Sequence, residues 1–286
     1  MNNFEIVKPV KVGVIQLEVY INQYSRNIAK ALEMIDVCAN EKCDLICLPE
    51  AFPTSINLPK GKTVSEEFPG ETTNILSAKA REYGVYLVAG IMEKNNQDVY
   101  SSALLFGPDG NIFGKYRRNY IYQLEKRFIT QGNSIEVFDT SIGRIGMIIG
   151  YDINFPEICR TLFIRRVEII VCPSQLISIV DQAVKHLAIA RAAENNCYFI
   201  LPSSVGENTL ARMKYMGNSM IVQSPIGLDV LSTNYIRQKE VIAKADYEET
   251  IIYGTLDIRK LRRNQQVNSH YDDIVNVNCQ EEIFIE

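Results

Sequence analysis

Several residues that could do chemistry come directly after apolar, strand-like runs. They are Glu50 after DLICLP, Arg117 and Arg118 after IFGKY, Gly150 and Asp152 after RIGMII, and Ser174 and Gln175 after VEIIVCP. In α/β folds ligands gather at the carboxyl ends of strands, so these residues are expected to meet. Burial at such a place raises the pKa of Glu50 toward the range of a general base. The alternative is that Glu50 caps the next loop or pairs with an arginine, because ion pairs shift pKa values as well.

The elements that hold these residues follow from the hydrophobic pattern of the first half. Apolar and β-rich runs predict strands over 11–19, 43–50 and 83–93. Three- and four-residue apolar steps predict helices over 24–41 and near 71–83. The stretch 99–117 reads as two strands around Pro108-Asp109-Gly110, which has the residues of a tight turn.

The second half repeats this order. It reads as strand 144–152, helix 155–166, buried strand 167–175, helix 179–195, strand 196–204 and a second hairpin over 219–233 around Pro225-Ile226-Gly227. Two similar β-α-β-α-β-hairpin halves predict an α/β fold, an α-β-β-α sandwich of two mixed sheets with a pseudo-two-fold repeat. We expect one domain over residues 1–286, with final strands in 241–257. Residues from about 272 to 286 are expected to form a surface tail or a partner-binding arm.

Composition excludes several function classes. The formal net charge of the 286 residues is −4, and no basic stripe of the kind that neutralises phosphates is present, so nucleic acid is not an expected partner. The first residues lack the pattern of a signal peptide, and no apolar run approaches the roughly 18 residues of a membrane span. The sequence therefore predicts a cytoplasmic protein that does not contact membranes.

The seven cysteines predict reduced core thiols rather than disulfides or a metal site. They are Cys38, Cys43, Cys47, Cys159, Cys172, Cys197 and Cys279, an odd set scattered mostly through apolar segments. The first three invite a zinc interpretation, but structural zinc sites favour short, loop-borne pairs of cysteines. We therefore expect no metal and no cofactor.

Ordered sequence blocks carry a resemblance to a known family. LPEAF at 48–52, GKYRRNY at 114–120 followed by Glu125, and GYDINFPE at 150–157 resemble the three signature blocks of the nitrilase superfamily, the carbon–nitrogen hydrolases. RAAEN at 191–195 and GNSMIVQSPIG at 217–227 resemble later blocks. The resemblance covers nearly the whole chain, and the family's α-β-β-α sandwich agrees with the internal repeat.

The resemblance implies roles for five positions. In the family a glutamate acts as general base, a lysine stabilises the oxyanion, a cysteine attacks the amide, nitrile or carbamoyl carbon, and a further glutamate helps to position the substrate or the lysine. Glu50 matches the base and Glu125 the second glutamate. Arg118 stands at the lysine position and Tyr120 at that of the usual histidine. The cysteine position, immediately before Tyr151-Asp152, is Gly150.

These departures change the expected chemistry. Gly150 has no side chain that could form a thioester, and Cys159 lies about two turns into the next helix. Strand alternation places Lys115 on the face of Arg117 and sends Arg118 to the other face. Arginine at 118 keeps the positive charge that two buried glutamates require, and its extra volume roughly offsets the missing cysteine side chain.

Three functions follow as hypotheses. The leading one is a catalytically degenerate or repurposed member that binds a small polar ligand, of amide, carboxylate or carbamoyl type, or a protein partner. The second is a hydrolase of small amides or N-carbamoyl compounds that uses a non-covalent route, or an amidase in which Gly150 is a deliberate disabling change. The third is a structural subunit of a mixed oligomer.

The ligand-binding residues and the assembly are also predicted. Asn57, Tyr122, Tyr151 and Gln175 are the candidate ligand-binding residues, with solvated loop positions as the alternative. Because members of the family commonly assemble, the resemblance also implies a homodimer or a larger homo-oligomer.

Overall fold

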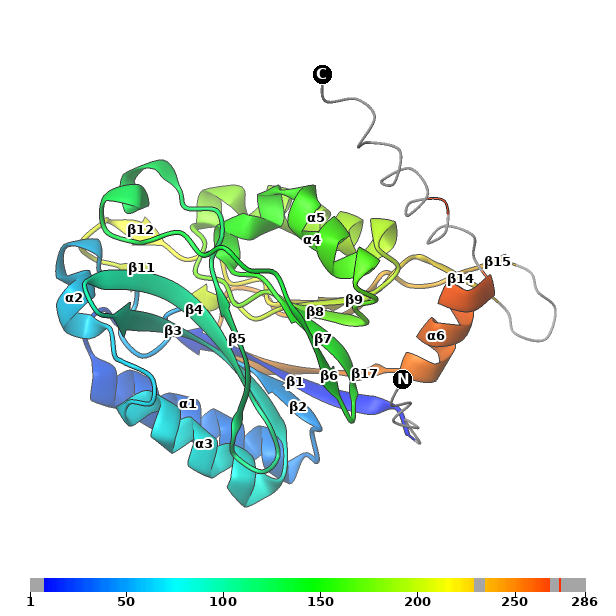
Figure 1. Cartoon of the computed structure of the whole chain (residues 1–286), viewed down its shortest axis with the longest axis horizontal. Helices are drawn as coiled ribbons and strands as arrows, with labels where there is room; N and C mark the ends of the chain where they lie inside the picture. The colour runs from blue at the N-terminus through cyan, green and yellow to red at the C-terminus, as the bar shows by residue number, and fades with distance from the viewer. Residues whose placement is uncertain (1–7, 229–234, 268–272, 274–286) are drawn as a thin grey trace.

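The computed structural model describes residues 8–228, 235–267 and 273. Two large sheets dominate the described part, and each has helices on its outer face (Figure 1). This arrangement is the α-β-β-α sandwich that the repeated sequence pattern predicts.

The first sheet has the strand order β10-β1-β2-β3-β4-β5, and β17 also pairs with β1. Its strands are β1 (Val10–Glu18), β2 (Leu45–Cys47), β3 (Tyr86–Asn95), β4 (Asp98–Phe106), β5 (Ile112–Arg117), β10 (Ser204–Val205) and β17 (Thr250–Leu256). Strands β1, β2 and β3 are parallel, whereas β4, β5 and β17 are antiparallel to their neighbours. Helices α1 (Tyr24–Asn40) and α3 (Glu71–Tyr83) connect the parallel strands.

The second sheet has the strand order β16-β13-β9-β8-β7-β6. Its strands are β6 (Val137–Thr140), β7 (Gly143–Met147), β8 (Ile169–Val171), β9 (Tyr198–Leu201), β13 (Met220–Val222) and β16 (Val241–Lys244). Helices α4 (Pro156–Ile164) and α5 (Asp181–Glu194) connect the parallel strands β7, β8 and β9. Each half therefore has three parallel strands, two connecting helices and an antiparallel strand on the third, which is the predicted repeat.

Short elements surround the two sheets. They are the 3₁₀ turns η1 (Leu58–Lys60), η2 (Gln123–Arg127), η3 (Gly150–Asn154) and η4 (Ser178–Val180), the helices α2 (Gly61–Val64) and α6 (Ile258–Val267), and the paired strands β11 (Glu207–Asn208) with β12 (Met213–Lys214) and β14 (Ile226–Leu228) with β15 (Tyr235–Arg237). Figure 1 places α2, β11 and β12 at one end of the sheets and α6 at the other.

Side-chain alternation along β1 divides the core into layers. Val12 and Val14 face the second sheet and pack in one cluster with residues such as Ile145 and Ile170. Ile15 and Leu17 face the opposite way, into a cluster with residues of α1 and α3. Because both faces of the parallel strands are covered, these strands read as nearly continuous apolar runs.

Two sequence-based predictions need correction. The strand predicted over 144–152 ends at Met147, and η3 turns the chain from Gly150. The hairpin predicted over 219–233 does not form between β13 and β14, because β13 pairs with β9 and β16 while β14 pairs with β15. On the side away from β9, the neighbour of β13 is therefore β16, which belongs to the predicted final strands.

The predicted C-terminal tail lies outside the described residues, apart from Asp273. In the described part of the chain, no helix is both long enough and apolar enough to cross a membrane.

Candidate active site

The residues that close the parallel strands come together at one end of the two sheets. Glu50 follows β2, Gly150 follows β7 and Gln175 follows β8, while Arg118 directly follows the antiparallel strand β5. Hydrogen bonds join residues of both sheets, because the backbone amide of Gln175 donates to Glu50 Oε2 at 3.2 Å. The sequence-based expectation that these residues meet therefore holds for Glu50, Arg118 and Gln175, and it is wrong for Arg117, which contacts Glu93 on the other face of the sheet.

Arg118 joins two glutamates in a buried ion cluster. Its Nη1 lies 3.1 Å from Glu50 Oε1, and its Nη2 lies 2.7 Å from Glu125 Oε2. The side chains of Glu50 and Arg118 are only 1% and 2% exposed. A buried ion pair of this kind needs further hydrogen bonds to both ions. On Arg118 this requirement is met only in part, because its Nε has no hydrogen-bond partner among the described residues.

Glu50 is fixed by more than the arginine. Ser101 Oγ donates to Oε1 at 2.7 Å, and the amide of Gln175 holds Oε2. Burial raises the pKa of Glu50 above its usual value, and the charge of Arg118 and the Ser101 hydrogen bond offset only part of this effect. The sequence offered burial and pairing with an arginine as alternative explanations for a shifted pKa of Glu50. The structure shows both, since Glu50 is a desolvated carboxylate and also the partner of Arg118.

Gly90 explains how Glu50 reaches its position. Gly90 lies within β3, and a Cβ on it would be 2.4 Å from the Cα of Glu50. Its amide donates to the carbonyl of Pro49 at 3.1 Å. A glycine inside a strand is typical of a close backbone approach, and this signal is readable in the sequence.

Gly150 occupies a position where a side chain is strained and obstructed. Its φ is +44°, which L-residues rarely adopt, and its amide donates to the carbonyl of Pro173 at 3.0 Å. A Cβ built on Gly150 would lie 2.6 Å from Glu50 Oε2, whereas real Cβ contacts are essentially never below 3.0 Å. The carboxylate of Glu50 therefore occupies the space beside Gly150.

Asp152 forms a second buried carboxylate behind this cluster. It accepts hydrogen bonds from Tyr116 Oη at 2.7 Å and from the amides of Tyr120 and Ile149 at 2.8 and 2.9 Å. Burial raises the pKa of Asp152 to about 6, against the lowering effect of these donors. This residue anchors the turn after β7 to the strand that carries Arg118.

Strand alternation along β5 works as the sequence predicts. Lys115 Nζ lies 2.9 Å and Arg117 Nη2 2.6 Å from Glu93 Oε1, on one face of the sheet. Arg118 points away from them, to Glu50. Lys115 therefore does not share the site of Arg118.

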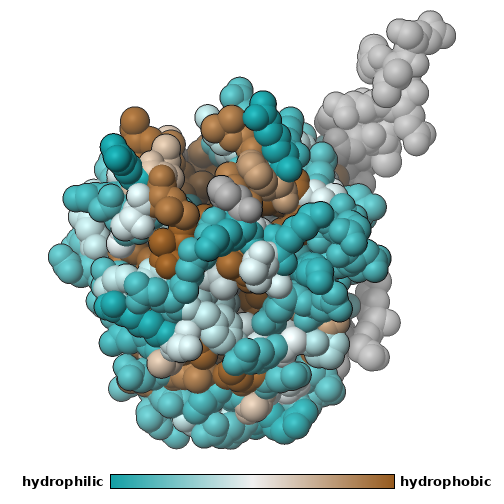
Figure 2. Space-filling view, turned by 90° about the vertical axis from the view of Figure 1, so that its left-hand side faces the viewer, coloured by the Kyte–Doolittle hydropathy of each residue, from teal (hydrophilic) through white to brown (hydrophobic). Residues whose placement is uncertain are grey.

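A cavity of about 300 Å³ lies beside the ion cluster. It is lined by Ile56, Asn57, Leu58, Glu125, Gln175, Ile177, Asn208, Leu210, Ala211, Met213 and Tyr215. Figure 2 views this end of the molecule, where apolar side chains gather around a hollow. Two of the predicted ligand-binding residues, Asn57 and Gln175, line the cavity, and so does Glu125.

Tyr122 and Tyr151 are not among the lining residues of this cavity. They contact each other edge to face, with ring centroids 5.5 Å apart, and Tyr151 also contacts Phe155 in this way. Tyr120 stacks on Phe155 at 3.6 Å. These rings form an aromatic group around η3, so a ligand role for Tyr122 and Tyr151 stays a prediction.

Sequence reasoning missed three contributors to the site. Ser101 lies in β4 and holds Glu50, while Tyr215 and Asn208 belong to the β11–β12 segment and line the cavity. A serine in the apolar run of β4 is a weak signal. The β11–β12 segment has no strong periodicity, so nothing local in its sequence indicates a cavity wall.

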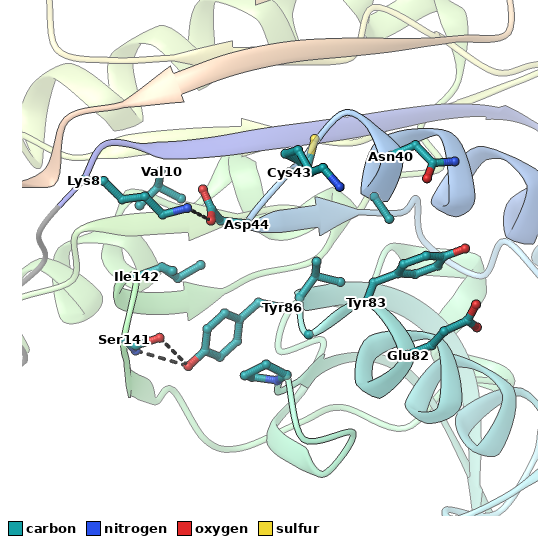
Figure 3. A pocket seen from close by; sticks show the side chains of 15 residues that line it. Lys8, Val10, Asn40, Cys43, Asp44, Glu82, Tyr83, Tyr86, Ser141 and Ile142 are labelled. Carbon is teal, nitrogen blue, oxygen red and sulfur yellow. Dashed lines mark hydrogen bonds and ion pairs between the residues drawn. The ribbon is translucent and has the colours of Figure 1, made fainter.

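The cysteines and a second cavity lie elsewhere. The six described cysteines are buried and free, and burial raises the pKa of Cys159 well above its usual value. Among the described residues, no group of three or more His, Cys, Asp and Glu side chains is placed to hold a metal ion. A second cavity, of about 660 Å³, is shown in Figure 3. Its lining includes Lys8 before β1, Asp44 before β2 and Tyr86 at the start of β3, and contains none of the predicted site residues.

Comparison with known proteins places the chain in a family. A family model described as carbon-nitrogen hydrolase matches residues 11–263. A protein named nitrilase from Pyrococcus abyssi (strain GE5 / Orsay) is 34% identical, over 92% of this chain and 95% of that protein. Omega-amidase NIT2 of Homo sapiens is 28% identical, over 90% of this chain and 91% of that protein.

Solved structures share the fold. Saccharomyces cerevisiae Nit3, a member of branch 10 of the nitrilase superfamily, superposes with a TM-score of 0.79 at 23% identity and covers 91% of this chain and 94% of its own. A mutant amidase from Nesterenkonia sp. AN1, with the acetamide moiety of fluoroacetamide added covalently at its active site cysteine, gives a TM-score of 0.76 at 17% identity, covering 92% of this chain and 96% of its own. The chain thus belongs to the carbon–nitrogen hydrolase family, the nitrilase superfamily.

Proposed function

We propose that this family member binds a small polar ligand in the cavity beside Glu125 and does not carry out the family's covalent hydrolysis. The observation that carries the proposal is the contact between Glu50 and Gly150. Glu50 Oε2 lies 2.6 Å from the place that a Cβ at position 150 would take, so the candidate nucleophile position holds no reactive atom and little room for one.

The charge arrangement supports binding rather than covalent catalysis. Both Nη atoms of Arg118 are held by glutamates, at 3.1 and 2.7 Å. A guanidinium fixed in this way balances two carboxylates, and a group that stabilises a developing oxyanion must instead aim its donors at the substrate oxygen. None of the six described cysteines lines the cavity. The relatives named nitrilase and omega-amidase make hydrolysis the activity against which this proposal is tested.

The test is a measurement of ammonia released from small amides and nitriles and from N-carbamoyl amines in the presence of purified protein. We expect no release above the uncatalysed background. Turnover near the ~10 s⁻¹ typical of enzymes would refute the loss of hydrolysis. Thermal unfolding with the same compounds tests binding, because a ligand that binds the folded chain stabilises it by RT ln(1 + L/Kd), where L is the free ligand concentration, and so raises its melting temperature as the ligand concentration increases.

A second candidate function is non-covalent hydrolysis, and one observation favours it. Burial raises the pKa of Glu50, and a carboxylate with a raised pKa is a better general base toward water. If ammonia is released by the wild-type chain and not by Glu50→Gln, this candidate replaces the first.

Restoring the family residues separates a lost nucleophile from a rebuilt pocket. The double substitution Gly150→Cys with Arg118→Lys supplies the thiol and the shorter cation that the resemblance implies. Gain of ammonia release, or of an acyl group on the new cysteine by mass spectrometry, would show that only these positions block catalysis. Continued inertness with intact folding would show that the surrounding pocket has changed as well.

The assembly and location predicted from the sequence remain part of the proposal. We propose a homodimer or a larger homo-oligomer, which light scattering of the purified chain tests. A chain that is monomeric alone and associates only with an active homologue would instead favour the structural-subunit hypothesis. The cytoplasmic location stays a prediction, and cell fractionation tests it.

A further inference from the structure

The cavity beside the ion cluster has apolar walls and one charged group. Its apolar residues are Ile56, Leu58, Ile177, Leu210, Ala211 and Met213. Among the described residues that line it, Glu125 is the only Asp, Glu, Lys, Arg or His. An apolar cavity with a single carboxylate selects for a ligand that has an apolar body and one polar end.

The other polar groups of the lining are already engaged within the protein. Gln175 Oε1 accepts from the Ser55 hydroxyl and the Ile56 amide at 3.1 and 2.9 Å, and its Nε2 donates to the Ser204 hydroxyl at 3.3 Å. The hydroxyls of Tyr215 and Ser55 lie 2.6 Å apart. These groups therefore hold one another in place.

The two asparagines of the lining are engaged in the same way. Asn57 donates to the side-chain oxygen of Asn22 at 2.9 Å and accepts from the amide of Lys60 at 3.3 Å. Asn208 donates to the carbonyl of Ile56 at 3.2 Å and accepts from the amides of Leu210 and Ala211 at 3.1 Å. Neither amide is left to act as the main partner of a ligand.

Glu125 differs because one of its oxygens is available. Oε2 accepts from Arg118 Nη2 at 2.7 Å and from the amide of Tyr122 at 3.2 Å. No described residue donates a hydrogen bond to Oε1, and the side chain is 15% exposed. The free acceptor at the cavity wall is therefore a carboxylate oxygen, which calls for a hydrogen-bond donor.

Within the ion cluster the carboxylates outnumber the cations, and the basic residues Lys126 and Arg127 of η2 are exposed and do not line the cavity. Arg118 is the one cation in contact with Glu50 and Glu125 among the described residues, and Asp152 adds a third nearby carboxylate whose charge acts on Arg118. Even with a proton on Glu50, two carboxylates remain for one guanidinium. Because neighbouring walls are apolar, this excess is poorly screened inside the cavity.

The basic residues of the nearby β11–β12 segment do not reverse this sign. Lys214 follows Met213, which lines the cavity, and therefore lies on the other face of β12, across from Glu207. Arg212 is exposed and does not line the cavity either.

We propose that the ligand of this cavity is an organic cation with an apolar body, such as a primary aliphatic amine or an amidine, whose cationic group hydrogen-bonds to Glu125 Oε1. The proposal rests on the ligand binding proposed above and narrows its chemistry. An amide can donate to the same oxygen without the charge attraction. A carboxylate would meet Glu125 in a cavity whose described lining residues include no cation, so this part of the sequence-based ligand prediction is disfavoured.

The test compares hexylamine, hexanamide and hexanoate, which share an alkyl chain and differ in charge. Binding is measured by calorimetry at pH 7.5, where an alkylamine is protonated as lysine is. We expect hexylamine to bind at least about tenfold more tightly than hexanoate, a difference of about 1.4 kcal/mol. In Glu125→Gln we expect hexylamine to lose about tenfold in affinity and its advantage over hexanamide to disappear.

Glu207→Gln is the matched control, since it removes an equal charge from β11, beside the cavity, at a residue that does not line the cavity. The proposal is supported if Glu207→Gln binds hexylamine as the wild-type chain does, while Glu125→Gln loses affinity for hexylamine and keeps the wild-type melting temperature. Equal losses in both variants would overturn the assignment to Glu125. Tighter binding of hexanamide or hexanoate than of hexylamine would overturn the cationic ligand and leave ligand binding intact, whereas no binding of any of the three would count against both.

Discussion

Substitution of Gly150 by alanine perturbs the site at its tightest point. The residue has a φ of +44°, and the new Cβ would lie 2.6 Å from Glu50 Oε2. Glu50 cannot move freely, because Ser101, Arg118 and the amide of Gln175 hold its two oxygens. The added methyl group therefore strains the backbone and also displaces a bound carboxylate.

The two effects have separate magnitudes. Holding an L-residue in the left-handed region costs about 1–2 kcal/mol. Displacing the carboxylate weakens a hydrogen bond to a charged group, which costs a further ~1.5–3 kcal/mol. We therefore expect Gly150→Ala to lower the free energy of unfolding by about 2.5–5 kcal/mol.

Gly84 provides the matched control. It ends α3 with a φ of +62°, and no heavy atom lies within 4 Å of a Cβ built on it. Gly84→Ala therefore causes the same backbone strain and the same change in the unfolded chain, but its new Cβ contacts no other residue. It should lower the free energy of unfolding by only about 1–2 kcal/mol. The difference between the two variants isolates the contact with Glu50.

The measurement is urea unfolding of both variants at pH 7, with the midpoint and the slope recorded. Equal losses of stability in Gly150→Ala and Gly84→Ala would refute the reasoning, because they would show that Glu50 does not occupy the space beside Gly150. In a Glu50→Ala background the excess cost at Gly150 should disappear, since the obstructing carboxylate is gone.

Three further predictions concern the buried charges. Arg118→Met leaves Glu50 and Glu125 without their cation and should cost about 3–5 kcal/mol in urea unfolding at pH 8. The loss should be smaller at pH 5, because burial raises the pKa of Glu50 and favours its protonated form, and an equal loss at both pH values would contradict this. Asp152 has a pKa of about 6, above the usual 3.8, so its contribution to stability is complete below 3.8 and is lost as the pH rises through 6; Tyr116→Phe removes a donor and should move that pKa higher in a carbon-13 NMR titration. Burial raises the pKa of Glu93, but the hydrogen bonds from Arg117, Ser102 and Lys115 outweigh burial and lower the pKa below the usual 4.5. The stabilisation from Glu93 is therefore present above pH 4.5 and is lost on acidification. In Glu93→Gln the loss of stability on acidification should be smaller than in the wild-type chain, and an unchanged dependence of stability on pH would count against the pairing.

The sequence predicts the elements whose signals are local. The helix predicted over 24–41 is observed as Tyr24–Asn40, and the one predicted near 71–83 as Glu71–Tyr83. Both have one apolar face at helical spacing, and both pack on the first sheet. Repetition of the same order in the second half then predicts the sandwich, because two similar halves bury their sheets against each other.

The pairing of β13 depends on contacts that no local pattern encodes. The sequence around Pro225-Ile226-Gly227 has the residues of a turn, as does the true hairpin around Pro108-Asp109-Gly110. Yet the strand that pairs with β13 at this edge is β16, which begins at Val241, 19 residues after Val222 in the sequence. Turn residues predict where the chain reverses and do not specify which strand pairs next.

The site likewise has one feature that local sequence predicts and one that depends on distant contacts. The direction of Arg118 was predictable, because alternation along β5 sends Lys115 and Arg117 to Glu93 and leaves Arg118 for Glu50. The position of the Glu50 carboxylate beside Gly150 was not, since it depends on Ser101 and on the amide of Gln175, which come from other strands. Sequence reasoning links the residues at 118 and 150 only through their compensating volumes and the retained charge.

Their common neighbour makes them one structural feature. Arg118 holds Oε1 of Glu50, and Oε2 of the same carboxylate lies 2.6 Å from the place that a Cβ at Gly150 would take. A single return to cysteine at 150 would push against a carboxylate that the guanidinium still holds in place. A single return to lysine at 118 would withdraw the two-pronged contact that joins Glu50 to Glu125, and Gly150 would still provide no nucleophile. If hydrolysis is absent as proposed, we expect its restoration to require both changes together, because the two positions interact through the carboxylate of Glu50.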